Sequence, residues 1–474
     1  MTKKNLTVSG LILIILIVFT GVLKAEVRLP AIFGDHMVLQ QQTDAVIWGK
    51  ASPGKAVKVQ TSWNKKTYST QAGSTGNWKL KVKTPAAGGP FNITISDGQT
   101  LTLKDVLIGE VWVCSGQSNM QMQMKGYRNQ PVLGANEAIA TSANKSIRLF
   151  TVEREKSLEL KDDFKGEWLH CEPENVAEFS AAAYFFGQMV QEALDVPVGL
   201  ICSSWGGTRI EPWISGNGFE RFDWVNLPDK QKEGDFSQQT PTVLFNAMIA
   251  PMAGYGIRGG LWYQGESNRN EPMEYEKLMA GLVENWRAEW EIGDFPFYYV
   301  QIAPYDYGKS GLNSAYLREA QLEASTAIPG MGMACLMDVG EKDCIHPADK
   351  KAAGQRLAYL ALVNTYGKKG IECSGPVLKE MNVEGSLVKL TFDHAGNGLT
   401  TYGKTLDNFE VAGENKQYHP AHAYLTSEGV TIFSERVQKP VAVRYAFKDF
   451  VVGELFNTEG LPASSFRTDD WEMK

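Results

Sequence analysis

The sequence has few of the residues that metal sites and nucleic-acid sites require. Its 474 residues include six histidines and six cysteines, and no two cysteines form a CxxC pair. Structural zinc sites usually place their ligands at such short spacings, so we expect no structural zinc site. No basic run occurs, and the formal net charge is -7. Nucleic-acid binding needs clustered Lys and Arg, so we expect no nucleic-acid partner.

The sequence also lacks internal repeats, low-complexity linkers and a dense cysteine framework. Hydrophobic residues make up 43% and charged residues 21% of the chain, as in ordinary globular proteins. A chain of this length exceeds one compact core, so we expect two or three domains. Several cysteines lie on apolar runs, where they fit as small buried side chains.

A long apolar run lies at the start of the chain and predicts export. Lys3 and Lys4 precede an uncharged stretch, residues 5–23, which ends near Ala25. This pattern is typical of a signal peptide, so we expect residues 1–25 to be removed from a secreted or periplasmic protein without stable membrane insertion. The alternative is an uncleaved membrane anchor, because about 20 apolar residues can span a bilayer. In both cases the body of the protein lies outside the cytoplasm.

The hydrophobic pattern divides the mature chain into three domains. Residues 26–104 and 374–474 contain short alternating runs separated by turn residues, which predict an N-terminal β-sandwich and a C-terminal β-rich domain. In residues 105–373, continuous apolar runs alternate with helical patterns, which predicts a doubly wound parallel sheet covered by helices. The fold class is therefore α/β, with an all-β domain on each side.

Elements of the central domain can be placed by residue number. The predicted strands are residues 106–115, 198–204, 256–263, 297–303 and 332–339. The predicted helices are Ser180 to Leu194, with Ser180 as N-cap, Tyr275 to Trp290, and Pro347 to Asn364, with proline in the first turn.

Polar residues follow four of these strands, at the point where each strand ends. The four segments are Gly116-Gln117-Ser118-Asn119, Trp205-Gly206-Gly207-Thr208-Arg209, Gln264-Gly265-Glu266-Ser267-Asn268 and Asp343-Cys344-Ile345-His346. In open parallel sheets, ligands bind at the carboxyl ends of the strands. We therefore expect the four segments to form one site.

Ser118, His346 and Asp343 have the residue types of a catalytic triad. A serine hydroxyl is inert until a base takes its proton, and that base needs a carboxylate to orient it. Asp343 and His346 are three residues apart, so one turn can bring both side chains to the same side. The alternative for Ser118 is a helix N-cap, and for the other two a capping Asp beside a surface His. Met120 occupies the last position of a GxSxG motif, which disfavours the nucleophile elbow of that motif.

An acyl-transfer site also needs donors for the developing oxyanion. The backbone N–H groups of Ser118 and of Gly206 or Gly207 can supply two of them. A side-chain amide, from Gln264 or Asn268, can supply a third. Gly206 and Gly207 could equally form only a tight turn.

Several sequence blocks, in order, resemble the sialate O-acetylesterases, a branch of the SGNH-type esterases. The blocks are VWVCSGQSNM, SSWGGTRIEPW, LWYQGESN and DCIHPADK, with flanking FGDHMVLQ, EFSAAAYFFG and NTEGLPASSFRTDDW. The resemblance covers nearly the whole mature chain and implies Ser118 as nucleophile with Asp343 and His346 as the acid–base pair. The chain reads GESN where the wider pattern has GxND, so the third donor stays open between Gln264 and Asn268.

The resemblance implies an O-acetylated sialic acid as substrate and an acyl-enzyme mechanism. Such a mechanism needs no metal and no organic cofactor, so we expect neither. Residues expected at the sugar are Gln117, Trp205, Arg209, Trp213, Tyr263 and Glu266, each of which could instead belong to the core or scaffold. Three alternatives remain: an esterase for acetylated xylan or another glycan, a non-catalytic sugar-binding protein, and a two-carboxylate glycosidase. The glycosidase would use Glu266 with Asp338 or Glu341, which leaves Ser118 and His346 unexplained.

Overall fold

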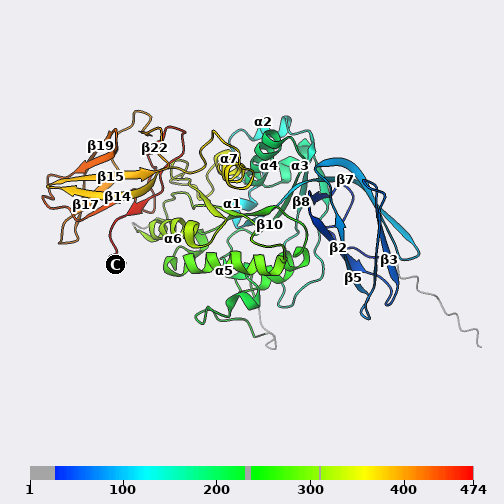
Figure 1. Ribbon diagram of the computed structural model, residues 1–474. Helices are drawn as coiled ribbons and strands as arrows, with labels where there is room; N and C mark the ends of the chain where they lie inside the picture. The colour runs from blue at the N-terminus through cyan, green and yellow to red at the C-terminus, as the bar shows by residue number, and fades with distance from the viewer. Residues whose placement is uncertain (1–26, 230–235, 309–310, 473–474) are drawn as a thin grey trace, which may run out of the picture.

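The computed structural model describes residues 27–229, 236–308 and 311–472 (Figure 1). The predicted signal peptide, residues 1–25, lies outside the described residues. Within the described ranges, no helix is long and apolar enough to cross a membrane. The N-terminal and C-terminal β regions lie at opposite ends of the molecule, with the α/β part between them (Figure 1). All six cysteines are unpaired, and four of them are buried, as their apolar surroundings predict.

The N-terminal region consists of two sheets that share a buried core. One sheet contains β1 (Val38–Gln40), β3 (Ala56–Thr61), β4 (Thr67–Gln71), β6 (Gly88–Ser96) and the start of β7 (Thr100–Gly116). The other pairs β2 (Asp44–Lys50) with β5 (Asn77–Lys83). In β5, Trp78, Leu80 and Val82 are buried between exposed lysines, which is the period-two pattern of a half-buried strand.

One strand, β7, joins this region to the central domain. Its first half pairs antiparallel with β6, and its second half, from Glu110 onward, pairs parallel with β10 (Val198–Ser204). The predicted boundary between residues 104 and 105 falls inside this 17-residue strand. The two domains are therefore connected by continuous sheet rather than by a linker.

The central sheet has the strand order β13-β12-β11-β7-β10-β8-β9. The remaining strands are β8 (Asn144–Thr151), β9 (Trp168–Cys171), β11 (Gly259–Tyr263), β12 (Phe297–Val300) and β13 (Met331–Ala334). Six strands are parallel, and the edge strand β9 runs antiparallel to β8. The sheet is therefore mixed, whereas the sequence pattern predicts a purely parallel sheet. Every residue of β10 is buried, as expected for a strand covered on both faces.

Helices cover both faces of the central sheet (Figure 1). On one face, α4 (Ala181–Leu194) packs against α7 (Lys350–Leu360); on the other, α5 (Pro272–Trp290) packs against α6 (Asn313–Ala327). Ser180 caps α4 as predicted, since its hydroxyl accepts from Ala183 N at 3.2 Å. The short helices are α1 (Ser118–Gln121), α2 (Ala135–Ala140) and α3 (Pro173–Glu178). Helix α7 begins three residues after the predicted Pro347, because Asp349 is its N-cap.

The C-terminal region consists of antiparallel sheets around a core of its own. One sheet has the order β14 (Val377–Glu384), β15 (Leu387–Asp393), β20 (Gly429–Phe433) and β19 (His422–Thr426). Another has the order β18 (Tyr418–Pro420), β17 (Phe409–Ala412), β21 (Ala442–Tyr445) and β23 (Phe466–Arg467), and β16 (Leu399–Thr400) pairs with β22 (Phe456–Asn457). Arg467 forms an ion pair with Glu319 of α6 at 2.8 Å, which attaches this region to the central domain.

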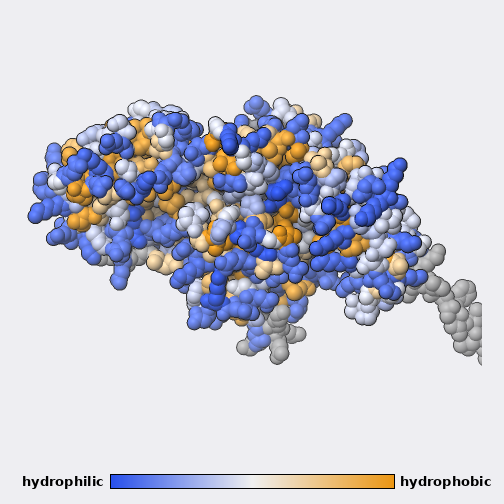
Figure 2. All heavy atoms as spheres, viewed as in Figure 1, coloured by the Kyte–Doolittle hydropathy of each residue, from blue (hydrophilic) through white to orange (hydrophobic). Residues whose placement is uncertain are grey.

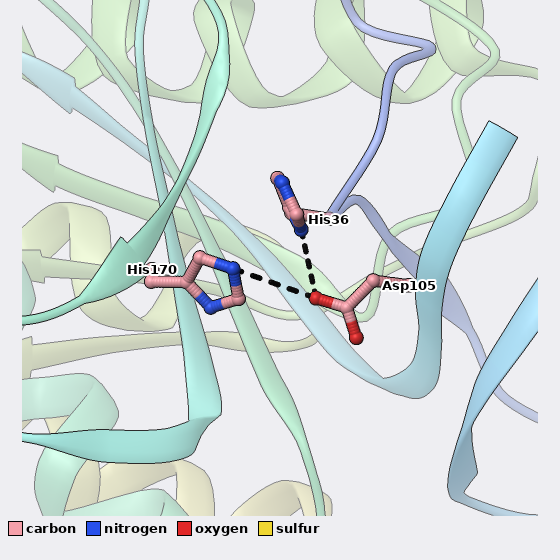
Figure 3. Close-up of side chains that lie close together, drawn as sticks. All are labelled: His36, Asp105 and His170. Atoms are coloured by element: carbon pink, nitrogen blue, oxygen red, sulfur yellow. Dashed lines mark hydrogen bonds and ion pairs between the residues drawn. The ribbon is translucent and has the colours of Figure 1, made fainter.

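A cluster of charged residues joins the N-terminal region to the edge of the central sheet (Figure 3). The Oδ2 atom of Asp105 lies 2.7 Å from His36 Nδ1, 3.6 Å from His170 Nε2 and 3.0 Å from Arg148 Nη2. Burial raises the pKa of Asp105, but the hydrogen bond to His36 and the Arg148 charge hold it below its ordinary value. The three His and Asp ligand atoms lie close enough for a metal ion. The buried Arg148 guanidinium repels a second cation, so we interpret the cluster as an ion-pair contact between domains.

Candidate active site

Three of the four predicted segments begin at the same level of the central sheet. In the register of the sheet, Gly116 at the end of β7 is aligned with Ser204 of β10 and with Tyr263 of β11. Ser118, Gly206 and Gly265 each follow two residues later. In the strand order of the sheet, β10 and β11 lie on opposite sides of β7. The three segments therefore meet at the topological switch point of the sheet, where ligands bind in open α/β sheets.

The nucleophile turn, residues 116–119, requires glycine at its first position. Gly116 has φ of 135°, and a Cβ atom there would lie 2.2 Å from the carbonyl oxygen of Tyr263. Gln117 N then donates to the same carbonyl at 3.0 Å. The chain therefore bends sharply off the strand, and Ser118 becomes the first residue of α1.

The Ser118 side chain does not cap this helix. The N-cap position is held by Gln117, which makes no side-chain capping bond. Ser118 is partly exposed, and within the described ranges no hydrogen bond engages its hydroxyl. A Cβ atom on Gly206 would lie 3.3 Å from Ser118 Cβ, so the Gly206 backbone is adjacent to the serine.

The base loop, residues 343–346, lies against the nucleophile turn. The side-chain nitrogen Nδ2 of Asn119 donates to the backbone carbonyl of Ile345 at 3.2 Å. The residue after Ser118 is therefore hydrogen-bonded to the residue before His346. Tyr127 also contacts both segments, since its hydroxyl donates to Ser118 O at 3.4 Å and its ring centroid lies 5.5 Å from that of His346. In the described part of the chain, no direct hydrogen bond joins the side chains of Ser118 and His346.

His346 is held as a neutral imidazole. Burial, and then the nearby Lys350 charge, lower its pKa to about 4. Its Nδ1 atom lies 2.7 Å from Gln130 Oε1. Asp343 is exposed, and no hydrogen bond or ion pair joins it to His346 among the described residues. The Asp343–His346 contact expected from the sequence is therefore not formed in this structure, and Gln130, which the sequence did not single out, occupies its place.

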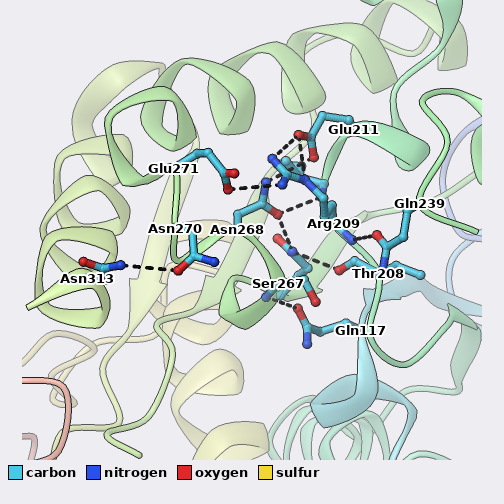
Figure 4. A network of polar contacts seen from close by, with 12 residues as sticks. Gln117, Thr208, Arg209, Glu211, Gln239, Ser267, Asn268, Asn270, Glu271 and Asn313 are labelled. Carbon is cyan, nitrogen blue, oxygen red and sulfur yellow. Dashed lines mark hydrogen bonds and ion pairs between the residues drawn. The ribbon is translucent and has the colours of Figure 1, made fainter. Parts of the chain in front are cut away.

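The side chains of Gln264 and Asn268 belong to a buried network of hydrogen bonds. Figure 4 shows Asn268 in this network. The Gln264 amide nitrogen donates to Thr208 O at 3.1 Å and to Asn268 Oδ1 at 2.8 Å, which uses both of its N–H groups. Asn268 donates to Glu211 at 3.1 Å and accepts from Ile210 N at 3.0 Å. The two amides therefore hold the β11 loop against the β10 loop, and the structure leaves no free N–H on Gln264 for an oxyanion.

In contrast to Gln264, Gln117 uses its side-chain oxygen in hydrogen bonds and keeps its amide nitrogen free among the described residues. Its Oε1 atom accepts from the backbone N–H group of Ser267 at 3.3 Å (Figure 4). It also accepts from the backbone N–H group of Gly265 at 3.3 Å. Within the described ranges its amide nitrogen has no hydrogen-bond partner, although the side chain is only 3% exposed. Of the backbone donors, Gly206 N–H is bonded to Gln121 Oε1 at 2.6 Å, and Gly207 has φ of 73°. Gln117 is thus a side-chain donor that could reach a ligand next to Ser118.

Arg209 is neutralised by two carboxylates (Figure 4). Its guanidinium lies 2.7 Å from Glu211 and 3.1 Å from Glu271. Burial lowers the pKa of Arg209, but the hydrogen bond and charge of Glu211 more than offset this, so the pKa is raised. The side chain is therefore charged and already paired.

Two of the predicted sugar-binding residues are core residues. Trp213 and Tyr263 are each 0% exposed, and Trp213 packs edge-on against Trp262. We correct their assignment: as fully buried core residues they do not line the sugar site. Trp205 is partly exposed, and the Arg154 guanidinium lies 5.7 Å from its ring centroid.

The fold and the site together define an α/β enzyme whose polar groups gather at the carboxyl edge of a largely parallel sheet. Residues 108–362, more than half of the chain, match the family described as carbohydrate esterase, sialic acid-specific acetylesterase. The chain is 32% identical to human sialate O-acetylesterase, over 77% of this chain and 76% of that protein. It is 28% identical to the mouse sialate O-acetylesterase over 93% of each.

A solved structure agrees with this assignment. The crystal structure of a carbohydrate acetylesterase from Xanthomonas citri has a TM-score of 0.86 to this chain at 33% identity, covering 94% of this chain and 100% of that one. The chain belongs to the sialic acid-specific acetylesterase family of carbohydrate esterases. The protein is therefore a carbohydrate acetylesterase, which the sequence motifs had predicted.

Proposed function

We propose that the protein is an exported SGNH-type serine esterase that deacetylates sugars through a covalent acetyl-serine. Ser118 attacks the acetyl carbonyl while His346 accepts the hydroxyl proton. His346 then returns that proton to the departing sugar hydroxyl, and water activated by the same histidine releases acetate. The amino-terminal pattern of residues 1–25 supports the export part of this proposal.

The Asn119–Ile345 hydrogen bond is the observation that carries the mechanism. It joins the neighbours of Ser118 and His346 at 3.2 Å, while the serine hydroxyl stays unbonded within the described ranges. Resting active sites often hold nucleophile and base slightly too far apart for a hydrogen bond, which forms when substrate binds. A low pKa keeps His346 able to accept a proton at neutral pH.

We propose an O-acetylated sialic acid as the substrate, in line with the names of the human and mouse relatives. The sialic carboxylate needs a cation, and Arg209 is already paired with Glu211 and Glu271. Arg154 is the cation we assign to this role, because it is exposed, lies over Trp205 and has no ion pair among the described residues. The paired state of Arg209 also favours the second candidate, an acetylated neutral glycan.

Acetate release from O-acetylated sialic acid and from acetylated xylan, measured side by side, tests the proposal. We expect the purified protein to release acetate from the first substrate with the higher kcat/KM. Ser118→Ala should lower turnover by about 10³-fold or more without loss of folding, because the catalytic groups act as a unit. Full activity in that variant would show that the nucleophile lies elsewhere, and preference for xylan would select the second candidate.

A further inference from the structure

Lys350 is a buried lysine next to the site that the proposed mechanism does not use. It lies on the first turn of α7, is 1% exposed, and points its ammonium group into the protein. The ammonium donates to Asn119 Oδ1 at 2.9 Å and to Pro347 O at 2.5 Å. Asn119 directly follows Ser118, and Pro347 directly follows His346. Lys350 therefore bonds both the nucleophile turn and the chain at the base.

Asn119 extends these bonds to a third segment of the site. Its amide nitrogen donates to Glu266 Oε1 at 2.6 Å, in addition to Ile345 O. Glu266 belongs to the loop after β11, so one continuous set of bonds links the loops after β7 and β11 with the base loop. We call Lys350, Asn119 and Glu266 the buried bridge.

Two members of the buried bridge, Lys350 and Glu266, are titratable groups that are almost fully removed from water. Burial lowers the pKa of Lys350 to about 8, against the opposing charge of Glu266 and the smaller effects of Glu341 and Asp349. Burial also raises the pKa of Glu266, whose Oε2 atom has no hydrogen-bond partner among the described residues. Apolar side chains of similar volume usually give equal or greater stability than a buried ion pair. Costly buried charges of this kind cluster at functional sites.

We propose that Lys350 is a positioning residue of the esterase reaction, holding the base loop against the nucleophile turn through Asn119 and Pro347. The inference rests on the proposed function of Ser118 and His346. The positive charge of Lys350 has a second effect, on the protonation of His346. Lys350 is the charged group that, after burial, disfavours protonation of His346, whose other neighbours Tyr127 and Gln130 are uncharged at neutral pH.

The test compares Lys350→Met with Lys351→Met, the exposed neighbour on the same helix. The readout is the pH profile of kcat and KM on 4-nitrophenyl acetate, with thermal unfolding as a folding check. For Lys350→Met we expect kcat to fall about tenfold or more, KM to change little, and the acidic limb of kcat/KM to move to higher pH. Lys351→Met should match wild type. A folded Lys350→Met with kcat and acidic limb unchanged would overturn the proposal.

Asn119→Ala keeps the inference testable if Lys350→Met does not fold. This variant cuts the bond from Lys350 to the nucleophile turn but leaves its charge beside His346. We expect a lower kcat with the acidic limb unmoved, and an unchanged kcat would overturn the positioning role. Failure of the proposed function looks different: wild type would lack esterase activity, or Ser118→Ala would retain it.

Discussion

The Nδ1 atom of His346 lies 2.7 Å from the amide oxygen of Gln130, in the place where the sequence predicts the carboxylate of Asp343. An amide oxygen can accept the Nδ1 proton and so leave Nε2 as the basic nitrogen. It cannot neutralise the imidazolium that forms when Ser118 is deprotonated, which is the role of the carboxylate in a triad. Gln130 thus suits the resting state of the base, and a role of Asp343 in the reacting state stays a prediction.

Variants of these two residues separate the roles. We expect Asp343→Asn to lower kcat by about 10³-fold, because a carboxylate that stabilises imidazolium acts in the transition state. Gln130→Ala should lower kcat by about tenfold, since it removes only the contact that orients the neutral ring. Steady-state kinetics on one acetyl ester provides the comparison. A near-normal Asp343→Asn beside a severely impaired Gln130→Ala would give the orienting role to Gln130 alone.

The oxyanion donors can be separated by combining kinetics with thermal unfolding. Gln117→Glu keeps the acceptor oxygen that binds Gly265 N and Ser267 N but removes the free N–H group. We expect kcat to fall by at least about 10²–10³-fold, because one oxyanion donor is lost and the new carboxylate repels the oxyanion.

Gln264→Ala and Asn268→Ala are the matched comparison for this prediction. Each removes buried hydrogen bonds and should lower stability by about 1–3 kcal/mol, with a smaller loss of kcat than in Gln117→Glu. The opposite order, with Gln264→Ala losing turnover alone, would restore Gln264 as the donor. If none of the three variants loses turnover, the hole consists of backbone N–H groups.

The low pKa of His346 predicts an acid-tolerant enzyme. His346 accepts a proton only while neutral, so the acidic limb of kcat/KM should lie near pH 4 rather than near 6.5. Because the pKa is lower in the folded than in the unfolded state, this histidine costs stability as the pH falls from 6.5 toward 4. Activity and unfolding must therefore be measured together. An acidic limb near pH 6.5 in folded protein would contradict the prediction.

We expect the Arg154 guanidinium to bind the carboxylate of an acidic sugar substrate. We expect Arg154→Ala to raise KM for O-acetylated sialic acid about tenfold, the scale of one exposed charge contact, and to leave 4-nitrophenyl acetate hydrolysis unchanged. Lys156→Ala is the control, since this exposed cation contacts a different ring, at 4.8 Å from the Phe236 ring centroid. Equal kinetics of Arg154→Ala and wild type on the acidic sugar would favour a neutral glycan.

Local patterns in the sequence were sufficient for the elements that surround the site. The apolar run at residues 198–204 coincides with β10, and the helix from Ser180 begins and ends as predicted. These segments are buried along their whole length or on one face, so their periodicity reports directly on packing. The pair β8 and β9 was missed, because polar and charged residues interrupt the apolar pattern of β8.

The sequence by itself determined the family and the mixed α/β class of the fold, because the family motifs are contiguous and the apolar runs and helical patterns are local. Only the tertiary structure decided which side chains are free. It places both N–H groups of Gln264 and one of Asn268 in hydrogen bonds, pairs Arg209 with two carboxylates, and places Gln130 and Lys350 beside Ser118 and His346 or their neighbours. Hydrogen-bond partners far apart in the chain are set by how loops pack on the folded sheet, and residue spacing carries no record of that packing.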